Sequence, residues 1–74
     1  RDLRQLGRYR PVAFLDDDPK LKGARLHDIP VLGGSSELVR VAHEVAAEMI
    51  LIAIPTLDRA EMRQLVQRCE QTGL

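Results

Sequence analysis

The longest unbroken apolar run of the chain, residues 49–54, constrains its fold more than any other feature. It reads Met-Ile-Leu-Ile-Ala-Ile, and Pro55 follows it. A strand with one face in water alternates apolar and polar residues, whereas an unbroken run rich in β-branched residues is typical of a parallel strand covered on both faces. The run therefore predicts a central strand in a parallel sheet with helices on both sides.

Other segments alternate between strand and helix patterns. Residues 11–16 hold a second apolar run, and residues 29–32 form a short one whose proline cannot donate to a ladder, which predicts an edge strand or a short extension. Apolar spacing predicts helices over 35–48 and 58–72, and residues 1–7 resemble the end of an earlier helix. This order predicts an α/β fold: a Rossmann-like, three-layer parallel sheet, truncated, without the first strand and its Gly-rich loop.

Two helix starts carry capping signals. Ser35 or Ser36 is placed to cap the helix over 35–48. Asp58 with Glu61 three positions later is typical of a capping box, and Gly73 suits a left-handed helix end. Both helices should therefore begin close to these residues.

Composition excludes several classes of function. The chain has 74 residues, enough for one small domain, and 11 basic residues balance 11 acidic ones. Zero net charge argues against nucleic acid as a partner, and no apolar run approaches the ~20 residues that span a bilayer, so no membrane contact is expected. Residues 1–25 carry seven basic and four acidic side chains, which indicates either a solvated helix end or a phosphate-binding arm.

The cysteine and histidine residues do not form a recognisable catalytic or metal-binding motif. The lone Cys69 lies on the apolar stripe of the last helix, which predicts a buried structural thiol. His27 and His43 are scattered and have no partners at metal-ligand spacing. We therefore expect no catalytic residue and no metal site in this chain.

The candidate binding site lies where the two apolar runs end. Ligands of α/β sheets bind outside the carboxyl ends of the strands. In this sequence the residues at those ends are Asp16 and Asp17 after one run, and Pro55 and Thr56 after the other. One carboxylate can accept both hydroxyls of a ribose, and Asp16 is in the position where dinucleotide-binding units place it, which favours NAD over NADP. The alternative is an ordinary turn, because Asp and Pro are common turn residues.

Four motifs together resemble a known family: PVAFLDDDP at 11–19, KG at 22–23, IPVLGG at 29–34 and IAIPT at 52–56. They resemble the CoA-binding-like Rossmann domain of bacterial polysaccharide-biosynthesis proteins, the membrane-associated nucleoside-diphosphate-sugar epimerases/dehydratases of the capsule-synthesis type. Similar domains occur in sugar-phosphate transferases that load undecaprenyl phosphate. Weaker similarity extends to NADH-sensing redox repressors and to the CoA-binding half of succinyl-CoA synthetase.

The resemblance implies a role for the chain as the nucleotide-binding portion of such an epimerase/dehydratase, at the cytoplasmic face of the inner membrane. It implies NAD or a nucleotide-sugar as ligand, with Asp16 at the ribose and Pro55 and Thr56 lining the cleft. The alternatives are a regulatory NADH- or CoA-sensing module and a transferase domain. Because a strand between 11–16 and 49–54 is expected to be missing, the open strand edges predict a homo-oligomer.

Overall fold

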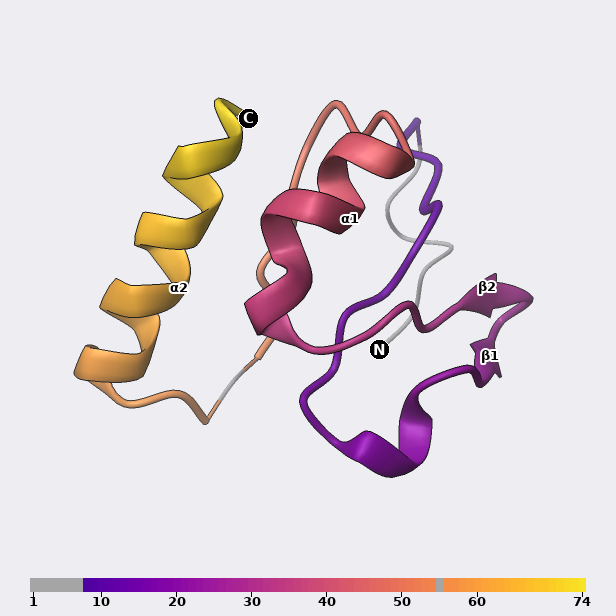
Figure 1. Ribbon diagram of the computed structural model, residues 1–74, viewed down its shortest axis with the longest axis horizontal. Helices are drawn as coiled ribbons and strands as arrows, with labels where there is room; N and C mark the ends of the chain where they lie inside the picture. The colour runs from indigo at the N-terminus through magenta and orange to yellow at the C-terminus, as the bar shows by residue number, and fades with distance from the viewer. Residues whose placement is uncertain (1–7, 55) are drawn as a thin grey trace.

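The computed structural model describes residues 8–54 and 56–74 (Figure 1). The expected helix end at 1–7 lies outside the described residues. The elements follow in the order η2 (Pro19–Leu21), β1 (Arg25–Leu26), β2 (Ile29–Pro30), η3 (Ser35–Glu37), α1 (Leu38–Glu44) and α2 (Arg59–Thr72). Helices α1 and α2 pack against each other.

The hairpin of β1 and β2 is antiparallel, with Arg25 opposite Pro30 and Leu26 opposite Ile29. Its two-residue turn is formed by His27 and Asp28, whose φ angles are 52° and 64°. A two-residue turn with both φ angles positive matches the right-handed twist of a hairpin, and His and Asp are among the non-glycine residues that tolerate this conformation.

A short parallel ladder joins residues 14–16 to the other edge of β2. The Phe14 N–H donates to the Pro30 carbonyl at 2.9 Å, and the Leu32 N–H donates to the Phe14 carbonyl at 3.0 Å. The next rung would need an N–H at position 30, which proline lacks. At the other end the Asp16 N–H donates to Gly33, whose φ is 146°.

These contacts correct two expectations about the strands. Among the described residues, the strand expected over 11–16 is seen as the bridge between Phe14 and Val31, because Pro30 stops this ladder on one side and Gly33 turns the chain on the other. Residues 29–32 do not form an edge, since they are paired with β1 on one side and with Phe14 on the other.

Residues 49–54 form no strand in the described part of the chain. A ladder requires a paired neighbour, and Ile50, Leu51 and Ile52 at the centre of the run have no backbone hydrogen bond to another described residue. In Figure 1 both 8–16 and 47–54 run in the same direction, toward the end of the molecule where η2 lies. The Rossmann-like parallel sheet therefore stays a prediction.

The first helix is shorter than expected. It opens with η3, α1 ends at Glu44 rather than at residue 48, and Ala46 with φ 53° turns the chain back. The cap is also different: the Ser35 N–H is accepted by the side chain of Asp17, so the N-cap expected at Ser35 or Ser36 is wrong.

The second helix begins and ends as its capping residues predict. Asp58 and Glu61 form the complete capping box of α2, and Gly73 ends the helix in the left-handed conformation with φ 78°. These capping interactions satisfy N–H and C=O groups that a helix end otherwise leaves without partners.

The core is small and centres on α1. The buried apolar side chains of the described residues are Val31, Leu38, Val41 and Ala42. The apolar stripe of α2 is only half-buried, Cys69 included, and Val66 is exposed. Burial of the Cys69 thiol is therefore partial rather than complete.

Candidate functional site

The acidic loop, Asp16 to Asp18, follows the parallel ladder directly. Asp16 is exposed, and its Oδ1 accepts the N–H of Asp18 at 2.9 Å. Within the described residues its other carboxylate oxygen has no hydrogen-bond partner. Asp18 caps η2 by accepting the Lys20 N–H at 3.0 Å, as expected of a turn residue. Asp16 is thus held in place by one oxygen and can accept a ligand hydroxyl with the other.

Asp17 has a different environment. Its Oδ1 accepts the Ser35 backbone N–H at 2.6 Å, and its Oδ2 accepts the Ser35 hydroxyl at 3.1 Å. A carboxylate at the first turn of a helix also interacts favourably with the positive end of the helix dipole. Both oxygens of Asp17 are therefore engaged in fixing the acidic loop to the start of η3.

Arg68 joins this cluster from α2. Its Nη1 donates to the Ser35 Oγ at 3.1 Å, so a chain of hydrogen bonds runs from Arg68 through Ser35 to Asp17. The sequence alone does not point to Arg68, because 33 positions separate it from Ser35 and no local pattern links them. Arg68 follows Leu65 by three residues, so it lies beside the apolar stripe of the helix. This spacing could have predicted that its side chain is half-buried.

The second expected strand end is only partly described. Thr56 is exposed, and Pro55 lies outside the described residues. The acidic loop and the segment that leads into α2 lie toward the same end of the molecule in Figure 1. A shallow, open depression follows Thr56, lined by Leu57, Asp58, Arg59, Met62 and Arg63. Two arginines and two apolar side chains thus line the surface that follows Thr56 along the chain.

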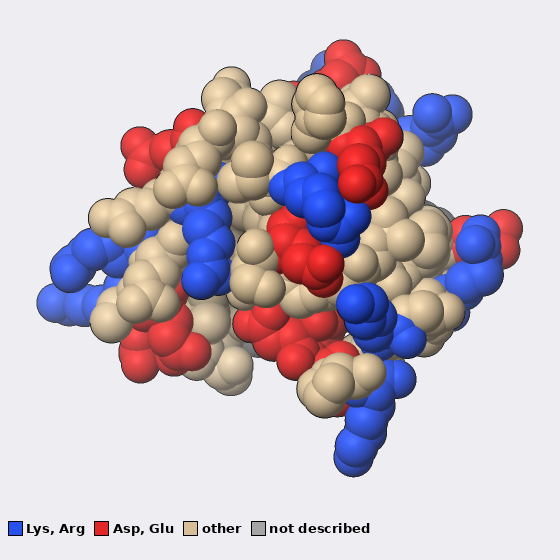
Figure 2. Space-filling model, in the orientation of Figure 1, with Lys and Arg blue, Asp and Glu red and all other residues tan. Residues whose placement is uncertain are grey.

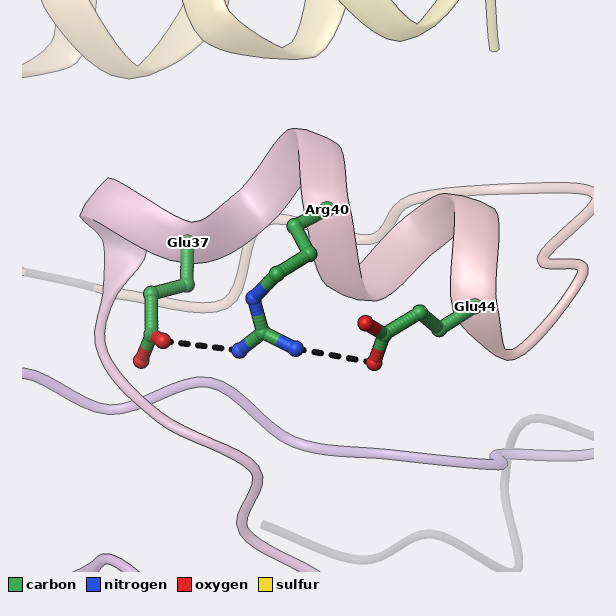
Figure 3. A network of polar contacts seen from close by, with 3 residues as sticks. All are labelled: Glu37, Arg40 and Glu44. Atoms are coloured by element: carbon green, nitrogen blue, oxygen red, sulfur yellow. Dashed lines mark hydrogen bonds and ion pairs between the residues drawn. The ribbon is translucent and has the colours of Figure 1, made fainter.

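A second charged network lies on η3 and α1 (Figure 3). Arg40 donates to Glu37 at 2.7 Å and to Glu44 at 2.8 Å. The hydrogen bond from Arg40, followed by the charge of Lys22, lowers the pKa of Glu37, and the two carboxylates raise the pKa of Arg40. All these groups are exposed at least in part, so the network belongs to the helix surface.

Gly33 is needed where Glu37 folds back over the loop. Its φ of 146° is a conformation that L side chains rarely adopt, and a Cβ there would overlap Oε2 of Glu37. The glycines before η3 therefore allow the acidic loop, β2 and the helix start to approach closely.

Charges over the visible face are mixed. Figure 2 shows Lys and Arg side chains interspersed with Asp and Glu rather than gathered into one patch. Among the described residues, no cluster of three His, Cys, Asp or Glu could hold a metal ion. Desolvation raises the pKa of the Cys69 thiol, which leaves less of the reactive thiolate at neutral pH. Neither described helix is both long and apolar enough to cross a bilayer.

The CoA-binding domain family matches residues 3–74, nearly the whole chain. The chain belongs to this family. The resemblance drawn from the four motifs is thereby confirmed at the level of a CoA-binding domain. No solved structure matches the chain.

Among curated proteins, the chain is similar to the probable polysaccharide biosynthesis protein EpsC of Bacillus subtilis (strain 168). The two are 34% identical over 64 residues, which cover 86% of this chain and 11% of EpsC. The chain thus spans about a tenth of the length of that relative.

Proposed function

We propose that the chain is the nucleotide-binding portion of a nucleoside-diphosphate-sugar epimerase/dehydratase of capsule or lipopolysaccharide biosynthesis, acting at the cytoplasmic face of the membrane. Family membership and the similarity to a probable polysaccharide biosynthesis protein support the general role. The finer assignment is supported chiefly by one observation, the half-engaged carboxylate of Asp16 at the end of the parallel ladder.

The proposed ligand is NAD or a nucleotide-sugar. The hydrogen bond from Asp18 orients the Asp16 carboxylate and leaves its second oxygen to accept a ribose hydroxyl. Asp17 was also a candidate, but the two hydrogen bonds from Ser35 give it a structural role, so the proposed ribose contact rests with Asp16. Thr56 and the adjacent Arg59 and Arg63 would face the phosphates.

Calorimetric titration of the 74-residue chain with NAD and UDP-glucose tests this assignment. Loss of a charge-assisted hydrogen bond costs about 1.5–3 kcal/mol, so Asp16→Asn should weaken binding by about 10- to 100-fold. Asp18→Asn is the matched control, because it removes the same charge two residues away and Asn still caps η2. Equal affinities of wild type and Asp16→Asn would contradict the proposal, as would equal losses in both variants.

CoA is the second candidate ligand, because the family is described as a CoA-binding domain. Binding of CoA would correspond to the alternative function, a regulatory sensing module. The ribose of CoA carries a 3′-phosphate, which a carboxylate at Asp16 would repel rather than bind. If CoA binds, Asp16→Asn should leave its affinity unchanged or improve it. CoA binding with no response to NAD or UDP-glucose would favour the sensing module over the enzyme portion.

A further inference from the structure

The Arg68 side chain reaches from α2 to the start of η3 and sets the direction of the hydrogen bonds there. A guanidinium only donates, so the Ser35 hydroxyl accepts the hydrogen bond from Nη1 of Arg68 at 3.1 Å. The single hydroxyl proton of Ser35 then goes to Oδ2 of Asp17, which lies 3.1 Å away and, as a carboxylate oxygen, only accepts. Arg68 therefore orients the Ser35 hydroxyl toward Asp17.

Asp17 is held by both carboxylate oxygens in this arrangement. Its Oδ1 accepts the Ser35 backbone N–H at 2.6 Å, while its Oδ2 accepts the hydroxyl. Gly34 leaves the space that this approach needs, since a Cβ there would lie 2.8 Å from Oδ1 of Asp17. Hydrogen bonds in a connected series strengthen one another, so loss of Arg68 should weaken both contacts between Ser35 and Asp17.

The position of Asp17 in turn determines how the Asp16 carboxylate is oriented. The N–H that Oδ1 of Asp16 accepts, at 2.9 Å, is that of Asp18, so it belongs to the peptide group that follows Asp17. The Asp16 N–H donates to the Gly33 carbonyl at 2.8 Å, which fixes the backbone on the other side. The contacts of Asp17 with Ser35 therefore limit rotation of the peptide group that orients Asp16.

We propose that Arg68 is a positioning residue for the nucleotide site, which acts through Ser35 and Asp17. It holds the acidic loop in the form in which the second oxygen of Asp16 can accept a ligand hydroxyl. This inference rests on the proposed function, because it gives Arg68 a part in binding at Asp16. Arg68 itself contacts no ligand, and its effect on affinity passes through the loop alone.

Amide exchange rates, measured by NMR on the 74-residue chain without ligand, test the ordering of the loop. Arg68→Met keeps a long apolar side chain on α2 but removes the donors. The Ser35 and Asp18 amides should exchange roughly five- to tenfold faster in this variant, and Arg68→Lys, which keeps a charged donor, should restore part of the protection. The Glu61 amide, which donates to Asp58 at 2.8 Å, should keep its wild-type rate. Unchanged rates at Ser35 and Asp18 would overturn the proposal.

Gly34→Ala disturbs the same contacts while Arg68 is intact. The added Cβ would force Oδ1 of Asp17 to move, and the φ of −94° at Gly34 suits alanine, so the backbone needs no change. The Ser35 amide should again exchange faster, and a wild-type rate there would count against the role of Asp17. Arg25→Met is the matched control, because the hydrogen bonds of Arg25 are made to Asp28 within the hairpin. It should leave the Ser35 amide unchanged.

Calorimetric titration with NAD and UDP-glucose tests the effect on binding. Arg68→Met should weaken binding by roughly fivefold, and the double variant with Asp16→Asn should bind no more weakly than Asp16→Asn alone. Additive losses would indicate a direct contact between Arg68 and the ligand and would overturn the positioning role. Wild-type affinity in Arg68→Met, beside a loss in Asp16→Asn, would overturn it and leave the proposed function in place.

Absence of binding by the wild-type chain would have a different meaning. It would overturn the proposed function and, with it, the role of Arg68 in binding. The exchange rates of the free chain would then still decide whether Arg68 orders the acidic loop, because that measurement needs no ligand.

Discussion

Asp16 and Asp17 are neighbours in the sequence, but the structure gives them separate roles. Asp17 uses both oxygens on Ser35 and holds the acidic loop to the start of η3. Asp16 accepts one hydrogen bond from the loop backbone and keeps an oxygen free within the described residues. Composition and spacing could show that an acidic cluster ends the strand. They could not show which aspartate is structural and which is open to a ligand, because that depends on contacts with a serine 18 positions away from Asp17.

Glu37 provides a pH-dependent contribution to stability. Its pKa lies below the ordinary value of 4.5, first because of the hydrogen bond from Arg40 and then because of the charge of Lys22. A lowered folded-state pKa stabilises the fold above the unfolded value, and this contribution is lost as pH falls through the folded value. Wild type should therefore lose more stability than Glu37→Gln between pH 7 and pH 3, measured by urea unfolding.

The control for this prediction is Glu48→Gln, which removes an exposed carboxylate that forms no ion pair within the described residues. It should retain the wild-type loss of stability with falling pH. Identical pH profiles for wild type and Glu37→Gln would show that the Arg40 network does not contribute.

At the scale of elements, helix α2 is the best predicted part of the chain. Its capping box and its left-handed end at Gly73 are local, so a few adjacent residues determine them. The strands depend on distant partners and were predicted less well. Within the described residues, 11–16 are joined to β2 by one bridge, since Pro30 lacks the N–H of the next rung, and residues 49–54 are not part of a strand.

The capping box makes a testable prediction for α2. Asp58→Ala removes the acceptor of the Glu61 N–H, the hydrogen bond that also lowers the pKa of Asp58. Loss of such a cap should lower Tm by about 4–8 °C in a domain of this size. Asp58→Ser keeps an acceptor oxygen and should recover most of the loss in a thermal melt followed by circular dichroism. Equal Tm values for Asp58→Ala and wild type would contradict the role of the cap.

At the scale of the whole molecule, few side chains are fully buried and apolar surface is left open. The described core is built around Val31 and α1, while Met49 and Leu51 stay exposed. The apolar run that predicted a central strand therefore has apolar side chains exposed to solvent at Met49 and Leu51. Its surroundings could not be predicted, because burial of a strand depends on elements that pair with it.

The acidic loop, the start of η3 and the segment before α2 lie toward one end of the molecule, where we propose that a nucleotide binds. Amide NMR spectra of the 74-residue chain, titrated with NAD and then with UDP-glucose, locate this binding surface residue by residue. The largest shift changes should fall on residues 16–18, Ser35 and Thr56. Changes concentrated on the outer face of α1, or no change with either nucleotide, would contradict it.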